Sequence, residues 1–170
     1  MIYYNNQTEG RSRLMKKLLT LIFLSSSLAA RAYWTPIDVS IFSPAELPPC
    51  NDAVYGLRVN VPYGRTSSMY GIDAGCAQHV RGSAGGIECG GCNFVTGRFA
   101  GIQVAFGSNF AVKELDGLQV GFYNCCRGES NGLQVGLVNW TYDMSGFQIG
   151  LVNFIWNSPL VCFPIVNAHF

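Results

Sequence analysis

One eight-residue segment determines how the rest of the sequence is interpreted: Gly132-Leu133-Gln134-Val135-Gly136-Leu137-Val138-Asn139. Nearly the same pattern returns as Gly146-Phe147-Gln148-Ile149-Gly150-Leu151-Val152-Asn153. Recurrence after so few residues is typical of repeat proteins, in which each unit is one small structural element. Positions in a repeat are counted here from its first Gly, so that Gly132 is position 0 and Asn139 is position 7.

The Gly at position 0 recurs through most of the chain. It stands at Gly56, Gly71, Gly86, Gly101, Gly117, Gly132 and Gly146, with spacings of 15, 15, 15, 16, 15 and 14 residues. Position 1 always holds a large apolar residue, and position 2 a polar one. Position 3 is small or apolar, and position 4 is usually Gly again. The sequence therefore predicts seven equivalent β units.

The alternation of apolar and polar residues predicts half-buried strands, because successive side chains of a strand point to opposite faces. We expect the apolar side chains at positions 1, 3 and 5 to form the core. The Gln and the second Gly of each unit should then face water. On this interpretation Val120→Asp should unfold the stack, whereas Gln119→Lys should be tolerated. Charged residues and length variation are expected in the turns between strands.

Two all-β architectures use one such unit per repeat. A β-solenoid of about seven 15-residue coils gives every position the same environment in each coil, which explains columns of one residue type. The alternative is a small antiparallel outer-membrane β-barrel of eight or so strands, whose natural period is two strands. The terminal Phe170 resembles the closing strand of such barrels. The single-unit period favours the solenoid.

The flanking segments divide the chain into four parts. Residues 1–32 are interpreted as a leader and signal peptide, and residues 33–54, rich in Pro, as an N-terminal cap. Residues 55–153 form the seven-repeat β domain. Residues 154–170 are a C-terminal cap or closing strand, since an open solenoid end exposes a sheet edge.

The N-terminal segment carries an export pattern. Lys16 and Lys17 precede the apolar run 18–24, and Ala30-Arg31-Ala32 fits a small-residue cleavage site. We expect cleavage after Ala32. Residues 33–170 then hold six basic and nine acidic residues, a net charge near −3, which argues against nucleic acid as a partner.

The repeat at Gly132 and the repeat at Gly146 resemble the units of a bacterial surface-repeat family. That family places tandem G-[LIV]-Q-[IVL]-G-L-x-N copies behind a signal peptide in Gram-negative bacteria. The resemblance covers nearly all of residues 33–170, and the repeats at Gly71 and Gly86 depart most, with Asp73 and Glu88 at the Gln position. It implies a location at the cell surface or outer membrane, with the periplasm as the alternative, and supplies no catalytic residue.

The function expected from these observations is structural or binding, not enzymatic. The chain should be an exported envelope module that presents a repetitive polar face to an unidentified envelope or host-surface partner, or to further copies. The alternative is a small outer-membrane barrel acting as an anchor or narrow channel, with membrane association through the barrel. No cofactor is expected.

Two polar columns are the candidate site. Four residues at position 2 are the candidate binding surface: Gln103, Gln119, Gln134 and Gln148. Four residues at position 7 are a candidate structural column, in which stacked amides bond to one another and to the turn backbone: Asn93, Asn124, Asn139 and Asn153.

The seven cysteines are the other chemistry-bearing residues. An exported chain meets oxidising conditions, so five of them are disulfide candidates without an assigned pairing: Cys76, Cys89, Cys92, Cys125 and Cys126. Cys125-Cys126, at a turn, is a candidate exposed cross-linking point. Reduced thiols that act as small fillers are the equally open alternative, with Cys89 in the core. The Cys89-x-x-Cys92 spacing has no second pair to complete a zinc site, and no metal is expected. Asp73 and Glu88 should share a solvated face.

Overall fold

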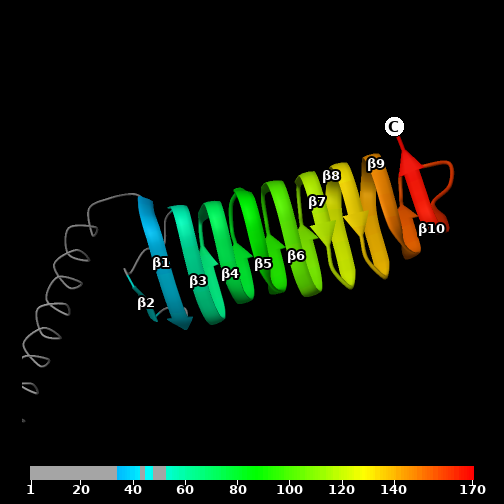
Figure 1. Ribbon diagram of the computed structural model, residues 1–170. Coiled ribbons are helices and arrows are strands. Elements are labelled where there is room, and N and C mark those ends of the chain that lie inside the picture. Colours follow the sequence, from blue (N-terminus) through cyan, green and yellow to red (C-terminus); the bar gives the residue numbers. More distant parts are fainter. Residues whose placement is uncertain (1–33, 43–44, 48–52) are drawn as a thin grey trace, which may run out of the picture. The chain divides into compact units, whose positions relative to one another are not determined.

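The computed structural model describes the backbone of residues 34–42, 45–47 and 53–170. The predicted leader and signal peptide, and part of the predicted N-terminal cap, lie outside the described residues. Within them the protein is all-β, and its ten strands form one sheet in the order β10-β9-β8-β7-β6-β5-β4-β3-β1-β2. Figure 1 shows the strands as successive coils of a parallel β-solenoid of about seven turns, which confirms the predicted fold.

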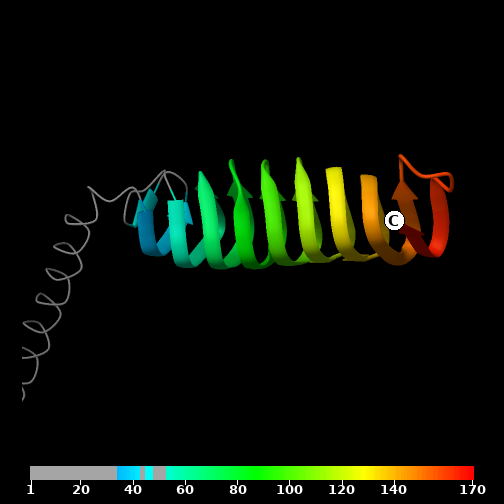
Figure 2. The same cartoon turned by 90° about the horizontal axis from the view of Figure 1, so that it is seen from above.

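The strand bounds follow the repeat. They are β1 (Trp34–Phe42), β2 (Ala45–Leu47), β3 (Ala53–Thr66), β4 (Ser68–Val80), β5 (Ala84–Val95), β6 (Arg98–Ala111), β7 (Glu114–Val120), β8 (Tyr123–Val135), β9 (Val138–Ile155) and β10 (Cys162–His169). Figure 2 shows from above how the chain winds from one coil to the next.

The register of the coils is the register of the sequence repeat. Gly56 lies opposite Gly71, Gly71 opposite Gly86, and the series continues without slippage to Gly146. All neighbours from β3 to β9 run parallel. The barrel alternative is therefore wrong, because consecutive strands of such a barrel are antiparallel.

The Gly at position 0 is required by close approach of neighbouring coils. All seven adopt positive φ angles, from 113° at Gly86 to 148° at Gly146. A Cβ atom on Gly132 would lie 2.0 Å from the carbonyl oxygen of Gly117. The position therefore excludes every residue that has a side chain, which explains why the column is invariant within this chain.

The apolar core occupies one half of each coil. Two columns of buried side chains meet there, one at position −2 and one at position 9 or 10: Val54, Met69, Ala84, Phe99 and Leu115, facing Val80, Val95, Ala111 and Cys126. Both columns adjoin the turn that carries the charged residues. The other half of the interior is filled by polar side chains, described below.

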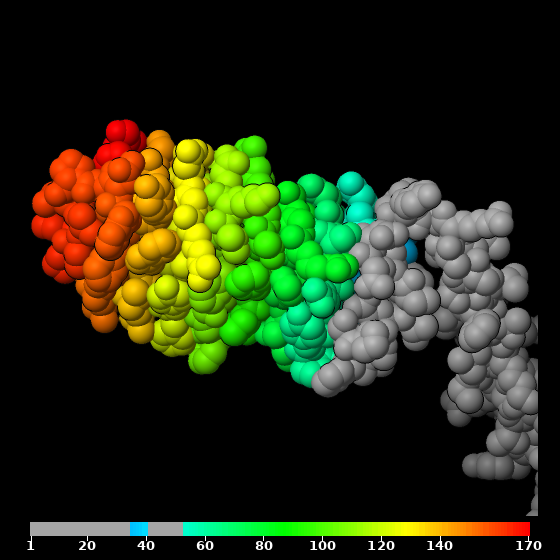
Figure 3. Space-filling view, turned by 180° about the vertical axis from the view of Figure 1, so that it is seen from behind, coloured from blue at the N-terminus to red at the C-terminus, as the bar shows by residue number. Residues whose placement is uncertain are grey.

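The two ends differ from the middle. β1 pairs parallel with β3, and β2 returns antiparallel along β1. At the other end β10 lies antiparallel on β9 and covers its edge. Figure 3 shows the coils between these ends as consecutive bands, coloured from cyan to red. The stack is thus closed at its C-terminal end by a strand of opposite direction, which blunts further edge pairing.

The variation in repeat length is distributed over both turns, not only the charged one. In the 16-residue repeat, Gly90 lies opposite Ala105 but Cys92 lies opposite Ser108, so the extra residue sits in an uncharged turn. In the 14-residue repeat the shortening falls between Thr141 and Asp143, opposite Cys126 to Glu129, where charged residues gather. The expectation that the charged turns absorb every change is correct only for the second case.

Candidate functional site

The glutamines at position 2 form a continuous buried ladder. Gln148, Gln134 and Gln119 each donate Nε2–H to the Oε1 of the preceding Gln, at 2.8, 2.8 and 2.7 Å. Gln103 donates in the same direction to Glu88 Oε2 at 2.8 Å. All four glutamines are fully buried. They are not a binding surface, and the predicted outward orientation is wrong.

The asparagines at position 7, together with Asn109 at position 8 of the 16-residue repeat, form a second ladder in the opposite direction. Asn93 donates to Asn109 Oδ1 at 2.8 Å, and the series continues through Asn124 and Asn139 to Asn153 at 2.8 to 2.9 Å. Each Nδ2 also donates to the backbone of the following coil, as Asn124 does to the Val135 carbonyl oxygen at 2.8 Å. Stacking of these amides, expected from the sequence, is present.

The inversion of the faces has a steric cause. Positions 0, 2 and 4 share one face of the strand, and positions 0 and 4 hold the crowded glycines. A Cβ atom on Gly136 at position 4 would lie 2.2 Å from the Gly121 carbonyl oxygen and 2.6 Å from Asn124 Nδ2. The glycines therefore have to face the narrow interior, and the Gln between them faces the same way. Strand alternation then forces the aliphatic side chains outward.

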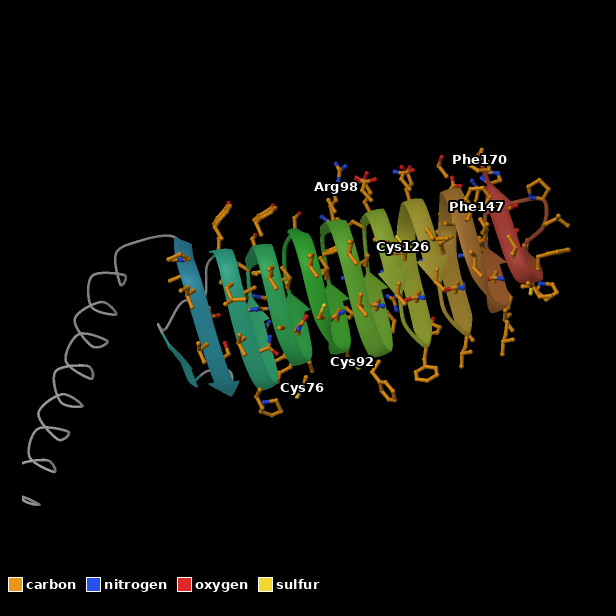
Figure 4. The ribbon with its side chains drawn as sticks, viewed as in Figure 1. Cys76, Cys92, Arg98, Cys126, Phe147 and Phe170 are labelled. Carbon is orange, nitrogen blue, oxygen red and sulfur yellow. The ribbon has the colours of Figure 1, made fainter. Side chains whose placement is uncertain are left out.

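The apolar side chains at positions 1 and 3 lie on the surface. Leu57 is 41% exposed, Ile72 49% and Phe147 47%, whereas Leu118, Val120 and Val135 are half-buried. The predicted aliphatic core is therefore wrong. Figure 4 shows Phe147 near the C-terminal end, beside Phe170, whose ring centroid lies 5.3 Å away. The part of each coil that follows position 5, which we call the second sheet face, carries a row of aromatic rings. Phe94 contacts Phe110 there, and Phe110 contacts Tyr123.

One turn of every coil is apolar, and we call its position-5 side chains the apolar edge. They are Val61, Cys76, Phe106, Phe122, Leu137 and Leu151, with Gly91 at the equivalent place in the third coil. Phe106 is 81% exposed and Leu151 67%. The rings of Phe106 and Phe122 are in edge-to-face contact with centroids 5.3 Å apart.

The opposite turn carries the charges, and we call it the charged edge: Arg98, Lys113, Glu114, Asp116, Arg127, Glu129 and Asp143. Arg98 bonds to Asp116 and its Nε lies 3.6 Å from Glu114 Oε2. Hydrogen bonds from Asn131 and Arg98 lower the pKa of Asp116. In Figure 4, Arg98 lies at one edge of the stack, and Cys76 and Cys92 lie at the other.

The Gln ladder ends, toward the N-terminus, in buried charges. Arg58 Nη2 bonds to Asp73 Oδ2, and Asn60 Nδ2 donates to Asp73 Oδ1 at 3.0 Å. Glu88 follows in register, and Asp38 lies opposite Arg58 on the other side. All four charged side chains are buried. Asp73 and Glu88 are adjacent as predicted, but the solvated face expected for them is wrong.

Burial controls the protonation of these acids. Loss of hydration raises the pKa of Glu88 to about 7, with a further increase from Asp73 and decreases from the Gln103 hydrogen bond and Arg58. Burial also raises the pKa of Asp73, against the opposing effect of Arg58. Near neutral pH a protonated Glu88 has nearly the shape and polarity of another Gln, so this column can continue the ladder.

The six described cysteines are free thiols. Cys76, Cys89, Cys92 and Cys162 are exposed, so Cys89 does not belong to the core. Cys125 and Cys126 are buried, and the predicted exposed turn at these residues is wrong. Burial raises the pKa of Cys126 to about 11. None of the five disulfide candidates is paired with another described cysteine.

The histidines do not converge with other ligand-type residues. His79 lies 3.1 Å from the Tyr63 hydroxyl and 3.3 Å from Thr96 Oγ1, and burial lowers its pKa. His169 Nδ1 contacts the Met144 carbonyl oxygen at 2.9 Å. Over the described part of the chain, no three His, Cys, Asp or Glu side chains are grouped closely enough to hold a metal ion.

Comparisons with known proteins add no assignment. No family model, no curated protein and no solved structure matches this chain. The resemblance to bacterial surface repeats therefore stays a prediction from the repeat itself. Among the described residues, no helix is long and apolar enough to cross a membrane.

Proposed function

We propose that this chain is a non-enzymatic, exported structural module of the bacterial cell envelope. The observation that carries the proposal is that its polar repeat residues form hydrogen bonds to one another inside the stack. The Gln side chains at position 2, which were the candidate binding surface, and the Asn side chains at position 7 form two hydrogen-bonded ladders inside the stack. Such a chain serves as a rigid support, because satisfied buried networks hold one arrangement.

The exterior of the module supports the same role. Its coils stack in register from Gly56 to Gly146, so its surface repeats along the stack. The repetitive face of the earlier expectation is retained, but it is apolar instead of polar. The compact unit runs from Tyr33 to Phe170, the segment that would remain after the predicted cleavage.

The proposal is tested by following the full chain in a Gram-negative host. A C-terminal tag allows the chain to be purified from separated cytoplasmic, periplasmic and membrane fractions, and N-terminal sequencing of the product locates the cleavage. We expect a processed chain that begins at Tyr33 and is found in the envelope fractions. A full-length chain that stays in the cytoplasm would overturn the proposal.

The matched control for this test is a variant with a blocked cleavage site. Ala32→Pro changes only the residue before the expected cut, and removal of small residues there prevents processing. The variant should be retained at its full length of 170 residues. If wild type and variant have the same N-terminus, residues 1–32 are not a signal peptide.

A further inference from the structure

We propose that the apolar edge inserts into the surface of a lipid bilayer while the charged edge stays in water. This inference deepens the envelope role proposed above, on which it rests, by naming the surface that the module contacts. The long axis of the stack would lie parallel to the membrane surface, and the apolar edge of each coil would be directed toward the bilayer. Phe106, Phe122, Leu137 and Leu151 would be immersed first.

Every coil separates its charged residues from its apolar surface. Positions 3 to 6 hold no Asp, Glu, Lys or Arg in any of the seven repeats. The charged edge lies across the coil, and a strand segment of about five residues spans about 17 Å. Interfacial amphipathic helices have the same division and immerse their apolar side about 5–10 Å into the bilayer. The coil is tall enough to do this without immersing its charges.

Backbone groups at the apolar edge form hydrogen bonds within the chain. Hydrocarbon offers no partner to a peptide group, so an immersed turn has to satisfy its own. Leu137 and Val138 both donate N–H to the Phe122 carbonyl oxygen, at 3.0 and 3.1 Å, and Val152 donates to Leu137 at 3.0 Å.

The Asn ladder completes this arrangement from the inside. Its Nδ2 groups donate to the carbonyl oxygens of Val120, Val135 and Ile149 at 2.8 to 2.9 Å, just before the turn. These carbonyls belong to position 3, where the strand segment that begins at position 0 starts to bend into the apolar edge. These backbone groups at and beside the turn therefore have partners within the chain, as a hydrocarbon environment requires.

Lipid and a second copy of the chain would cover different parts of the exposed apolar surface. A second copy packed face to face would cover positions 1 and 3 of one sheet face. It would leave the aromatic row around Phe110 and the apolar edge in water. A bilayer covers the apolar edge together with exposed side chains that adjoin it on both faces, such as Val104, Ile149 and Phe94.

A shallow groove along this edge suits acyl chains. It has a volume of about 620 Å³ and runs over the last four coils, between Phe106, Phe122, Leu137 and Leu151 and the aliphatic side chains of Val135 and Ile149. Its long axis follows the stack. An extended hydrocarbon chain would fill it without meeting a charged side chain, because none lines it.

The test is flotation of the purified full chain with phosphatidylcholine vesicles, whose zero net charge removes electrostatic attraction and repulsion. We expect wild type to float with the vesicles. Phe122→Asp and Leu151→Asp should each lower the partition coefficient at least about tenfold, because each places a charge where the proposal immerses an apolar side chain in the bilayer. Ser145→Asp is the matched control, since it adds the same charge at an exposed residue in register with Asn131 beside the charged edge, and it should float like wild type.

Two further measurements keep each outcome decisive. Circular dichroism verifies that each variant is folded, and Phe122→Ser replaces any variant that is not. Light scattering without lipid reports the oligomeric state, and a dimer abolished by Phe122→Asp with unchanged flotation would show that a second copy occupies the edge. Equal flotation of edge and control variants would overturn the proposal. All variants share one N-terminus, so failure of export in the fractionation experiment does not alter this comparison.

Discussion

Gln103 donates its Nε2–H to Glu88 Oε2 at 2.8 Å inside the stack, where an amide ladder meets a carboxyl group. Glu88 Oε1 has no partner in the structure, although the atom is buried. The pair marks the point at which a neutral column changes to a charged one. Three of the predictions below concern the interior and its boundary, and two concern the surface and the end of the stack.

The first prediction concerns the pH dependence of stability at Glu88. Its pKa is about 7 in the folded chain against an ordinary value of 4.5, so the folded state holds the proton more tightly. The cost of ionising Glu88 is absent below about pH 4.5, grows as the pH rises, and is complete above about pH 7, where it reaches about 3 kcal/mol. Glu88→Gln should remove this loss of stability.

Urea unfolding at pH 5 and pH 8 measures the effect. We expect Glu88→Gln to match wild type at pH 5 within about 1 kcal/mol and to exceed it clearly at pH 8. The exposed Glu129→Gln is the control and should follow the wild-type profile. Parallel profiles for wild type and Glu88→Gln would show that the Glu88 carboxyl group is not shielded from water in the folded chain.

The second prediction concerns the Gly column. Gly146→Ala would place a Cβ atom 2.0 Å from the Gly132 carbonyl oxygen at a φ of 148°. We expect a loss of at least about 3 kcal/mol in the free energy of unfolding, since backbone strain and a steric clash add. The neighbouring Ser145→Ala, on an exposed side chain, should change it by less than about 0.5 kcal/mol. Similar melting curves for the two variants would contradict the close coil contact.

The third prediction concerns thiol reactivity. Cys76, Cys89, Cys92 and Cys162 are exposed, whereas Cys125 and Cys126 are buried. With a pKa of about 11, Cys126 has on the order of one thiolate in a thousand at pH 8. A maleimide should therefore label the first four in the folded chain, and the Cys125-Cys126 pair only after unfolding. Peptide mass mapping reads the sites, and early labelling of Cys126 would argue against the register of β8.

The fourth prediction concerns the C-terminal strand. β10 pairs with β9 and accepts the last amide of the Asn ladder, since Asn153 Nδ2 donates to the Phe163 carbonyl oxygen at 3.1 Å. A chain truncated after Ile155 exposes the β9 edge and should associate into larger species by edge pairing. Light scattering on a sizing column detects this. Leu160→Ser, on an exposed side chain beside β10, should elute like wild type; no difference between truncated and intact chains would mean that β10 is not a cap.

The fold was predictable because the period of the repeat reports it directly. The nearly constant spacing from Gly56 to Gly146 indicates that each coil has the same environment, and stacked coils provide that. The Asn ladder was predictable for the same reason, since a column of amides at one position implies stacking. These inferences need no knowledge of which side of the strand is buried.

The orientation of the strands was not predicted correctly, because alternation identifies two faces without saying which one is inside. The usual assignment of aliphatic residues to the core failed at Leu57 and Ile72, which are exposed. A signal was nevertheless present in the sequence. Gly117 and Gly121 share a face with Gln119, and repeated glycines mark a place with no room for side chains, which is the interior of a narrow coil.

The charged residues at the N-terminal end were also misplaced. Asp73 and Glu88 occupy position 2 and therefore follow the Gln column inward, where Arg58 compensates Asp73. Sequence reasoning treats carboxylates as solvated, since unpaired buried acids are rare. Only the equivalence of position 2 in every coil, together with the correct orientation, would have placed them inside.

The most direct test of the inverted stack is a comparison of two adjacent substitutions in the fifth coil, measured by urea unfolding without lipid. Gln119→Lys places an ammonium group in a fully buried position and breaks two ladder hydrogen bonds, so we predict a loss of several kcal/mol or failure to fold. Val120→Asp changes a half-buried surface side chain and should cost about 1 kcal/mol or less. The reverse order, with Gln119→Lys tolerated and Val120→Asp unfolded, would contradict the account.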